Sequence, residues 1–440
     1  MKRPLAAAIA LCLMLAAALP AARAADTAYS RSVLDGGLTL VSQRAGGDLA
    51  AACLFVKVGS ACEDAGNNGV TSLLNRLVLA CHPLAGAAPP VLKIEQLGGR
   101  VTAETSGSYS CFTLVVPVRN FPEALKVLAD AVAGPDCSEA TLSTERAALD
   151  AERTRLGDRL ADRAYGVFMK KTYAGRSCGL DPAGTVQSVG RLGIDDVERW
   201  RDTYYRPANM TLSITADIGP EQAAKLAAQA FKGLTAASGP DGGAETPDPG
   251  GQCVKVDMFE ETAAGTGAAA VIGYSAPSPD SPDYPALRLA AALLSEGMGS
   301  SVFRELRENN RSAYSFGSVM PAVSGSSRLA FYVVTDPGSL GDAVNGIKRS
   351  VESLRDGDVT DEELARAKGM VLGELTFRSE TACDRAWNAG YYESMGLGPD
   401  YLERLAGLVD KVGKKELSAA AGRYLGEYTQ VVLRPGNGAR

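Results

Sequence analysis

The 440-residue sequence contains a single histidine, His82. One histidine cannot supply the two imidazoles of a helical zinc motif, and a Ser-His-Asp or Cys-His catalytic site would have to be built on this residue alone. His82 follows Cys81 and precedes Pro83, and no G-x-S-x-G context surrounds it. We therefore interpret His82 as a residue near a helix C-terminus, where a cation is favourable, and not as a catalytic base.

Long apolar runs are absent except at the N-terminus. There, Lys2 and Arg3 precede an apolar run over residues 5–19, and the small-x-small triplet 22–24 follows. The run is too short to span a bilayer and ends before a typical cleavage site, which predicts a secretory signal peptide over residues 1–24. A retained membrane anchor is the alternative. We expect an exported protein, periplasmic or secreted, without stable membrane insertion.

The sequence has no C-x-x-C pair, which argues against a ribbon-type zinc site or a thioredoxin-like redox site. An even number of cysteines in an exported chain allows disulfides, although the sequence does not give their pairing. Several, such as Cys53 and Cys111 in strand-like segments, can equally be small buried hydrophobic residues. The cysteines that remain after cleavage are Cys53, Cys62, Cys81, Cys111, Cys137, Cys178, Cys253 and Cys383.

An excess of basic residues is also absent, because the formal net charge of the whole chain is −6. The predicted signal peptide contains three of the 45 basic residues, so its removal leaves 42 against 51 acidic residues, a net charge of −9. Nucleic acids and anionic membrane surfaces call for basic patches, and none is present. We therefore exclude nucleic acid as a partner.

What the sequence does contain is a repeated order of elements. A Gly/Pro-rich segment at 236–252 lacks apolar periodicity and predicts a linker between an N-terminal domain (25–235) and a C-terminal domain (253–440). Strands without regular βαβ alternation favour an α+β fold of two homologous halves, each a mostly antiparallel sheet with helices packed on one face. The first half predicts strands at 51–60 and 98–118, helices from Gly69, at 121–134 and from Ser138 to about 168, and a closing helix and strand within 200–218. The second half predicts strands at 267–277 and 327–337, helices at 284 to about 294, 341 to about 354 and 360 to about 378, and a closing helix and strand within 419–436.

The helix predicted from Gly69 has an unusual polar face, within the segment 69-GVTSLLNRLVLACHP-83. Ser72, Asn75 and Arg76 lie at positions i, i+3 and i+4, so they share one face of an otherwise apolar helix. This is the spacing at which a helix presents metal ligands. None of these three side chains is a good metal ligand.

The chain resembles the pitrilysin/insulinase family of zinc peptidases, in its shorter, processing-peptidase-like branch. Four segments carry the resemblance in the expected order: GSACEDAGNNGVTSLLNRLVL, YYRPANMTLSITADI, FRELRENNRSAYSFGS and DEELARAKGMVLGEL. The resemblance covers nearly the whole chain after the signal segment. It implies two homologous α+β halves that form one side of a clamshell chamber.

Active members of the family carry H-x-x-E-H on this helix, with two zinc-binding histidines and a glutamate base, and a distant glutamate completes the site. The corresponding residues here are Ser72, Asn75 and Arg76, so the resemblance implies that the zinc motif is lost. Glu152 falls at the position of the distant ligand, and Glu145 lies seven residues earlier. We hypothesise that Arg76 occupies the former metal position and pairs with Glu152 or Glu145. The alternative is that Arg76 points to solvent.

Active members also use an arginine and a tyrosine, seven residues apart, to hold the substrate backbone and stabilise the oxyanion. Arg307 and Tyr314 match this pair, and both side chains can donate to a developing negative charge. The family binds substrate by adding an extended peptide to a sheet edge, and the positional match is the segment 98–106, including Gly99 and Ala103. The alternatives are an ordinary arginine and tyrosine and a purely structural strand.

The resemblance leads to a first hypothesis: an exported, non-catalytic subunit of a heterodimeric zinc peptidase, which supplies Arg307 and Tyr314 to a zinc-bearing homologous partner acting on peptides. We expect no cofactor in this chain, and zinc in the partner. The second hypothesis is a scaffold or binding protein of the same family with no proteolytic role. A third, a zinc peptidase that acts alone, conflicts with Ser72, Asn75 and Arg76.

Overall fold

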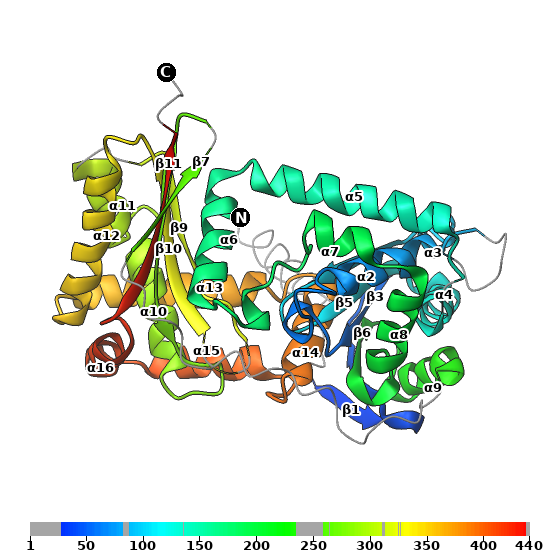
Figure 1. Cartoon of the computed structure of the whole chain (residues 1–440). Coiled ribbons are helices and arrows are strands. Elements are labelled where there is room, and N and C mark those ends of the chain that lie inside the picture. The colour runs from blue at the N-terminus through cyan, green and yellow to red at the C-terminus, as the bar shows by residue number, and fades with distance from the viewer. Residues whose placement is uncertain are drawn as a thin grey trace, which may run out of the picture.

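The computed structural model describes residues 28–81, 88–134, 136–234, 258–263, 265–309, 313–323, 325 and 327–436. The predicted signal peptide, the predicted linker, His82 and Cys253 lie outside the described residues. Within them, the chain forms one six-stranded and one five-stranded sheet with helices packed on both (Figure 1). This is the predicted α+β fold of two homologous halves.

The first sheet has the strand order β1-β2-β6-β3-β5-β4. Its pairs are antiparallel except for β2 and β6, which run parallel. β4 lies at one edge, and β5 is its only strand neighbour in the described part of the chain. The strands are β1 (Tyr29–Val33), β2 (Thr39–Arg44), β3 (Leu49–Val56), β4 (Arg100–Thr105), β5 (Ser110–Pro117) and β6 (Met210–Ala216).

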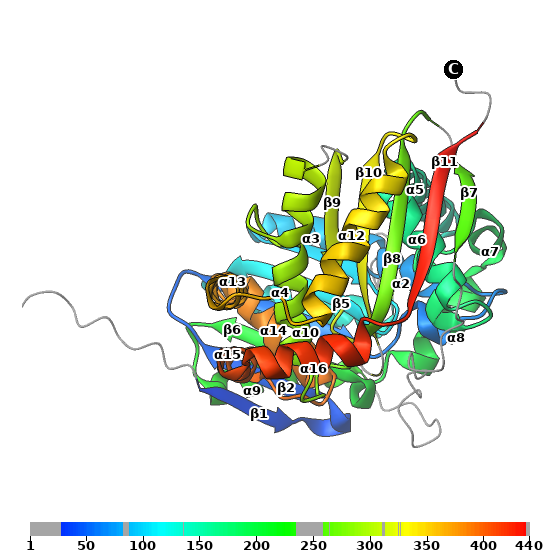
Figure 2. The ribbon, with the colours of Figure 1, turned by 90° about the vertical axis from the view of Figure 1, so that its left-hand side faces the viewer.

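The second sheet has the order β7-β11-β8-β10-β9, with β7 and β11 parallel and the other pairs antiparallel. Figure 2 shows this sheet with a long helix, α12, lying across one face. The strands are β7 (Phe259–Ala263), β8 (Ala268–Ala276), β9 (Ser315–Val319), β10 (Ser327–Thr335) and β11 (Tyr428–Pro435). Each sheet therefore contains a single parallel pair.

Except for one helix in each half, described below, the helices that contact a sheet pack on one face of the sheet of their own half and bury its apolar side chains. The helices of the first half are α2 (Val70–Ala80), α3 (Pro90–Gln96), α4 (Phe121–Ala133), α5 (Glu139–Gly157), α6 (Leu160–Thr172), α7 (Val186–Arg191), α8 (Ile194–Tyr204) and α9 (Pro220–Ala230). Those of the second half are α10 (Tyr284–Ser295), α11 (Ser301–Phe303), α12 (Leu340–Arg355), α13 (Asp361–Phe377), α14 (Ala382–Ser394), α15 (Tyr401–Lys411) and α16 (Lys414–Tyr424), with a π-helical turn η7 (Arg304–Asn309) after α11.

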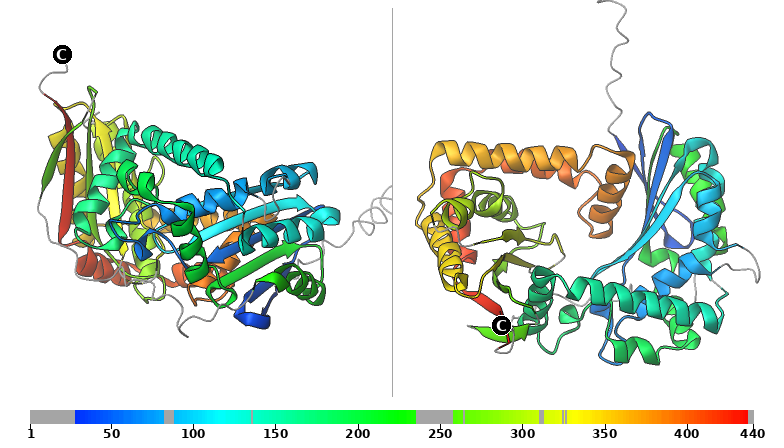
Figure 3. Two further views of the ribbon diagram at one scale, coloured as in Figure 1. Left: turned by 45° about the vertical axis from the view of Figure 1, so that its right-hand side comes forward. Right: turned by 90° about the horizontal axis from the view of Figure 1, so that it is seen from above.

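Two helices are exchanged between the halves. After α5 the chain enters α6, which packs on β8 and β11 of the second sheet, and after α13 it enters α14, which packs on β3 and β6 of the first sheet (Figure 3). Gly273 of β8 admits the ring of Phe168 from α6, because a Cβ there would overlap the ring. Gly390 of α14 similarly admits Phe55 of β3, whose ring would lie 2.7 Å from a Cβ. Each sheet is thus covered on its second face by a helix of the other half.

The predicted segments agree with the observed elements, and the helices that follow Ser138 and Thr360 both have N-caps. The hydroxyl of Ser138 accepts from the backbone N–H of Thr141, and Thr360 forms a capping box with Glu363. One prediction was wrong: the segment from Ser138 to about 168 is not a single helix. It breaks after Gly157 into α5 and α6, because the backbone of Arg159 between them is extended, with φ −84° and ψ 110°.

Candidate functional site

The N-terminus of α2 is held by a buried carboxylate. Glu63 lies before the helix and accepts hydrogen bonds from the backbone N–H groups of Gly69 and Thr71 and from the side-chain amide of Asn68. A carboxylate at this end of a helix satisfies free N–H groups and faces the positive end of the helix dipole. Burial raises the pKa of Glu63. This residue, which sequence analysis missed, fixes the position of the helix that carries the candidate site.

Ser72 and Asn75 are both engaged in structural hydrogen bonds. The hydroxyl of Ser72 donates to the carbonyl of Pro182 at 2.6 Å. The buried amide of Asn75 donates to the hydroxyls of Thr105 at 2.7 Å and Ser110 at 2.9 Å. Asn75 therefore ties α2 to the hairpin of β4 and β5.

The carbonyl oxygen of Asn75 accepts a hydrogen bond from the hydroxyl of Tyr205. Burial raises the pKa of Tyr205, so its hydroxyl remains protonated and can donate. With this contact, both ends of the Asn75 amide have protein partners. A buried and fully bonded amide is typical of a structural residue.

Arg76 lies between two carboxylates of α5. Its Nε is 2.9 Å from an oxygen of Glu145, and its Nη1 is 3.1 Å from an oxygen of Glu152. Of the Arg76 side chain 31% is exposed, against 18% for Glu145 and 45% for Glu152. The pairing that we hypothesised is present, and it includes both acids.

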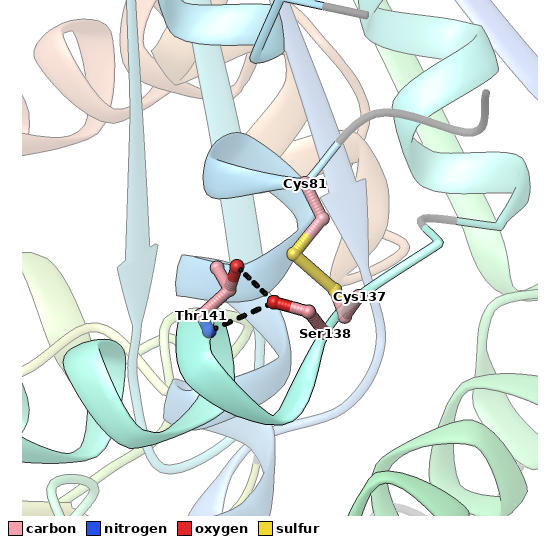
Figure 4. The surroundings of a disulfide bond; sticks show 4 residues. All are labelled: Cys81, Cys137, Ser138 and Thr141. Carbon is pink, nitrogen blue, oxygen red and sulfur yellow. Dashed lines mark hydrogen bonds between the residues drawn. A yellow bond between two sulfur atoms is a disulfide. The ribbon is translucent and has the colours of Figure 1, made fainter. Parts of the chain in front are cut away.

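A disulfide joins the same two helices. Cys81, directly after α2, is bonded to Cys137, directly before α5, across a sequence separation of 56 residues. Figure 4 shows this bond beside the cap of α5, where the hydroxyl of Ser138 contacts the backbone N–H and the hydroxyl of Thr141. The helices α2 and α5 are thus linked covalently at one end and by the Arg76 ion pairs along their length.

The residues at this position do not fit a zinc ion. The guanidinium of Arg76 is a permanent cation and has no lone pair to offer a metal. The oxygen atoms of Ser72 and Asn75, which could offer one, already form hydrogen bonds with Pro182 and Tyr205. In the described part of the chain, no group of three histidine, cysteine or acidic residues is placed to hold a metal. The two glutamates that face the site neutralise the guanidinium of Arg76 instead.

The second half contains a similar contact. Arg288 of α10 pairs with Glu374 of α13 and lies 3.4 Å from an oxygen of Glu296. As with Arg76, one arginine on the first α-helix of the half contacts two acids. Both acids of Arg76 belong to α5, whereas of the two acids of Arg288 only Glu374 belongs to the long helix α13. An arginine with two carboxylates therefore fastens the corresponding pair of helices in each half.

Arg307 and Tyr314 lie together in the structure. Arg307 belongs to η7, and its Nη2 donates to the backbone carbonyl of Tyr314 at 2.6 Å. The Tyr314 side chain is 61% exposed, and its hydroxyl donates to Asp336. This hydrogen bond raises the pKa of Tyr314. Both residues are exposed, and their hydrogen bond fixes them relative to each other. The single hydroxyl proton of Tyr314 is used in its bond to Asp336.

Gly99 and Ala103 lie on or beside the edge strand β4. A Cβ at Gly99 would lie 2.6 Å from the carbonyl oxygen of Val115 on β5, so this glycine serves the packing of the hairpin itself. Ala103 is half-buried and packs against the core of the first half. The close contact with β5 therefore explains the glycine at position 99. A role of Gly99 or Ala103 in substrate binding stays a prediction.

Two free cysteines in the described part of the chain, Cys111 and Cys383, do not have the properties of reactive thiols. Burial raises the pKa of Cys111 and, to about 11, that of Cys383, and both lie near Cys53 where α14 packs on the first sheet. Thiols with raised pKa values are poor nucleophiles at neutral pH. This arrangement agrees with the interpretation of Cys53 and Cys111 as small buried residues.

Comparisons with known proteins give a consistent result. The sequence profile described as insulinase (peptidase family M16) matches residues 39–185, and that of the peptidase M16 inactive domain matches residues 191–371. An uncharacterized zinc protease of Streptomyces coelicolor is 24% identical over 353 residues, which are 80% of this chain and 77% of that protein. One of Mycobacterium tuberculosis strain H37Rv is 23% identical over 419 residues, 94% of this chain and 95% of that protein.

Solved structures share the fold. A protease from Helicobacter pylori has a TM-score of 0.85 at 20% identity, covering 93% of this chain and all of that chain. A peptidase M16 inactive domain from Pseudomonas fluorescens has a TM-score of 0.84 at 18% identity, covering 94% and 99%. None of the helices in the described part of this chain is long and apolar enough for a membrane span. From the two matched profiles and the shared fold, the chain belongs to the insulinase-type M16 peptidase family.

Proposed function

We propose that this chain is an exported, non-catalytic subunit of a heterodimeric insulinase-like metallopeptidase. The observation that carries the proposal is the guanidinium of Arg76 between Glu145 and Glu152. By their resemblance to active members, these residues correspond to the positions of the zinc site. A cation in this place removes metal chemistry from the chain but keeps α2 and α5 in position. The zinc, and the residues that activate water, would belong to a homologous partner subunit.

The contribution of this chain would be Arg307 and Tyr314. A fixed cation and a phenol on one exposed surface can hold a peptide backbone and donate to an oxyanion. Arg307 uses one guanidinium nitrogen for the Tyr314 carbonyl, and its other nitrogens remain potential donors. Tyr314 can donate to a ligand only when its hydroxyl leaves Asp336.

Peptide binding would use the free edge of β4. Backbone N–H and C=O groups at an edge can pair with an added extended strand. Asn75 holds this edge through Thr105 and lies within 3.5 Å of the carbonyl oxygen of Glu104. Asn75, which corresponds to the glutamate base of active members, would then support the strand in this chain.

The test is the cleavage of a quenched peptide by the chain alone, by a co-expressed homologue with an intact H-x-x-E-H motif, and by the mixture, with and without a zinc chelator. We expect activity only in the mixture, abolished by the chelator. Arg307→Ala should lower the turnover of the mixture without affecting its assembly, measured by size-exclusion chromatography. Normal turnover in this variant would contradict the role given to Arg307.

A second candidate function is a scaffold or binding protein without a proteolytic role. The contact between the Tyr314 hydroxyl and Asp336 favours it, because it uses the only proton that this phenol can donate. An absence of complex formation with any zinc-bearing homologue, and of activity in the mixture, would favour the scaffold.

A further inference from the structure

The edge strand β4 presents its side chains alternately to two different surroundings. Thr105 contacts Asn75 of α2, on the face covered by helices of the first half. Glu104, the preceding residue, receives the indole N–H of Trp387 from α14, on the face covered by the exchanged helix. A peptide added to this edge would follow the same alternation, so every second side chain would lie on the Glu104 side.

Glu104 is an acid without a cationic partner. Its Oε1 accepts from the hydroxyl of Tyr109 at 2.8 Å and lies 3.4 Å from the Trp387 indole nitrogen. Both donors are neutral, and no ion pair among the described residues includes Glu104. The side chain is exposed, and no donor from the described residues contacts its Oε2. One oxygen is therefore positioned by aromatic donors, and the other is open to a ligand.

Aromatic rings gather beside this carboxylate. The rings of Tyr109 and Trp387 are 6.2 Å apart in an edge-on arrangement, and Trp387 stacks on Tyr391 at 4.7 Å. The ring centroid of Phe55 is 5.6 Å from that of Tyr109, so Phe55 packs against this group of rings. Aromatic faces attract cations through their quadrupole, and they shield a neighbouring ion pair from water.

We propose that Glu104, with Tyr109 and Trp387, forms a subsite for a lysine or arginine side chain of an extended peptide bound along β4. The inference rests on the peptide-binding role proposed above and adds the chemistry of the peptide. Charge complementarity favours this ligand, since the carboxylate lacks a counter-ion and the whole chain carries more acidic than basic residues. Trp387 comes from the second half, so the subsite exists only because α14 crosses to the first sheet.

The test compares the dissociation constants of fluorescent peptides that differ at one position, with lysine, glutamine or glutamate, by fluorescence anisotropy of the purified chain. We expect the lysine peptide to bind about three- to tenfold more tightly than the glutamine peptide at low salt, a ratio typical of a cross-strand ion pair beside aromatic rings. The ratio should decrease as the salt concentration rises.

Three variants decide the assignment. Glu104→Gln keeps an acceptor for Tyr109 and should bring the lysine and glutamine peptides to equal affinity, and Glu104→Lys should make the glutamate peptide the tightest ligand. Glu123→Gln, an exposed position on α4, is the matched control and should retain the preference. An unchanged lysine preference in Glu104→Gln would overturn the subsite. Binding of all peptides without a charge preference would also overturn it but leave the proposed function intact, whereas no binding of any peptide would overturn both.

Discussion

Replacing Arg76 by methionine tests whether the ion pairs between α2 and α5 hold the first half together. Methionine keeps much of the length of the side chain but removes the charge. The bond to Glu152 is partly exposed, so we assign it up to about 1 kcal/mol. The bond to Glu145 is less exposed, and the loss of a charged hydrogen bond there costs about 1–2 kcal/mol. Together, Arg76→Met should lower the free energy of unfolding by about 2 kcal/mol.

The assay is thermal unfolding of the mature chain, followed by circular dichroism. Each 1 kcal/mol shifts Tm by about 2–4 °C in a unit of about 150–250 residues and by less in a larger one. Because the exchanged helices join the two halves, Arg76→Met should lower the Tm of the chain by about 2–4 °C. Lys126→Met is the matched control, because Lys126 also pairs with an acid, Asp130, but on an exposed helix surface with 64% of its side chain accessible. That variant should change Tm by about 1 °C at most.

A double variant separates the loss of the contact from the cost of an unpaired acid. Adding Glu145→Gln to Arg76→Met removes the carboxylate that the first change leaves without a cation, so part of the lost stability should return. The reasoning is refuted if Arg76→Met melts no lower than Lys126→Met. A higher Tm would mean that desolvation of the ions outweighs their attraction, as happens for some buried pairs.

Three further predictions concern the same region and the second half. Replacing both Cys81 and Cys137 by serine should cost about 4 kcal/mol in the loop-closure estimate, and a reductant should lower the Tm of the natural chain but not of the variant. The hydrogen bond from the backbone N–H of Thr360 lowers the pKa of Glu363 from its ordinary value of 4.5. The stability that ionised Glu363 contributes should therefore be full above pH 4.5 and lost as the pH falls through the lowered pKa, and Glu363→Gln should weaken this acid dependence of Tm. The triple change Ser72→His, Asn75→Glu and Arg76→His restores the H-x-x-E-H motif and should give one zinc ion per chain by elemental analysis, with Glu152 as the third ligand. A folded variant without zinc would show that the helix no longer has the geometry to bind the metal.

Much of the fold could be predicted because the local signals are strong. The segments 51–60 and 267–277 are continuous apolar runs, and both became central strands, β3 and β8. Ser138 and Thr360 are followed by acids, and both proved to be N-caps. The edge strands β1, β7 and β9 were not predicted, because each has only five residues and most of them are half-exposed or exposed. The interior strand β2 was not predicted either, although it is mostly buried.

The exchange of α6 and α14 could not be predicted, since it depends on contacts between residues far apart in the sequence. Phe55 and Gly390 are complementary in shape, but neither residue carries a local signal of the other. The same holds for Glu104 and Trp387, which meet through this packing. The contact of Arg76 with the acids of α5 was expected only from the resemblance to the family, because the spacing of the helix residues places Ser72, Asn75 and Arg76 on one face but does not show what lies opposite.

The crossing of α6 and α14 also bears on how the chain can be divided. If the chain were divided within 236–252, the first fragment would lack α14, which covers one face of its sheet, and the second would lack α6. Each fragment would also carry a helix whose apolar face packs on the sheet of the other fragment. Neither fragment could bury its own apolar surface fully, so each would be unstable or aggregate when produced by itself. Co-expressed, the two pieces would have a strong reason to associate, and this protein should therefore tolerate a break in its covalent chain better than the loss of either half.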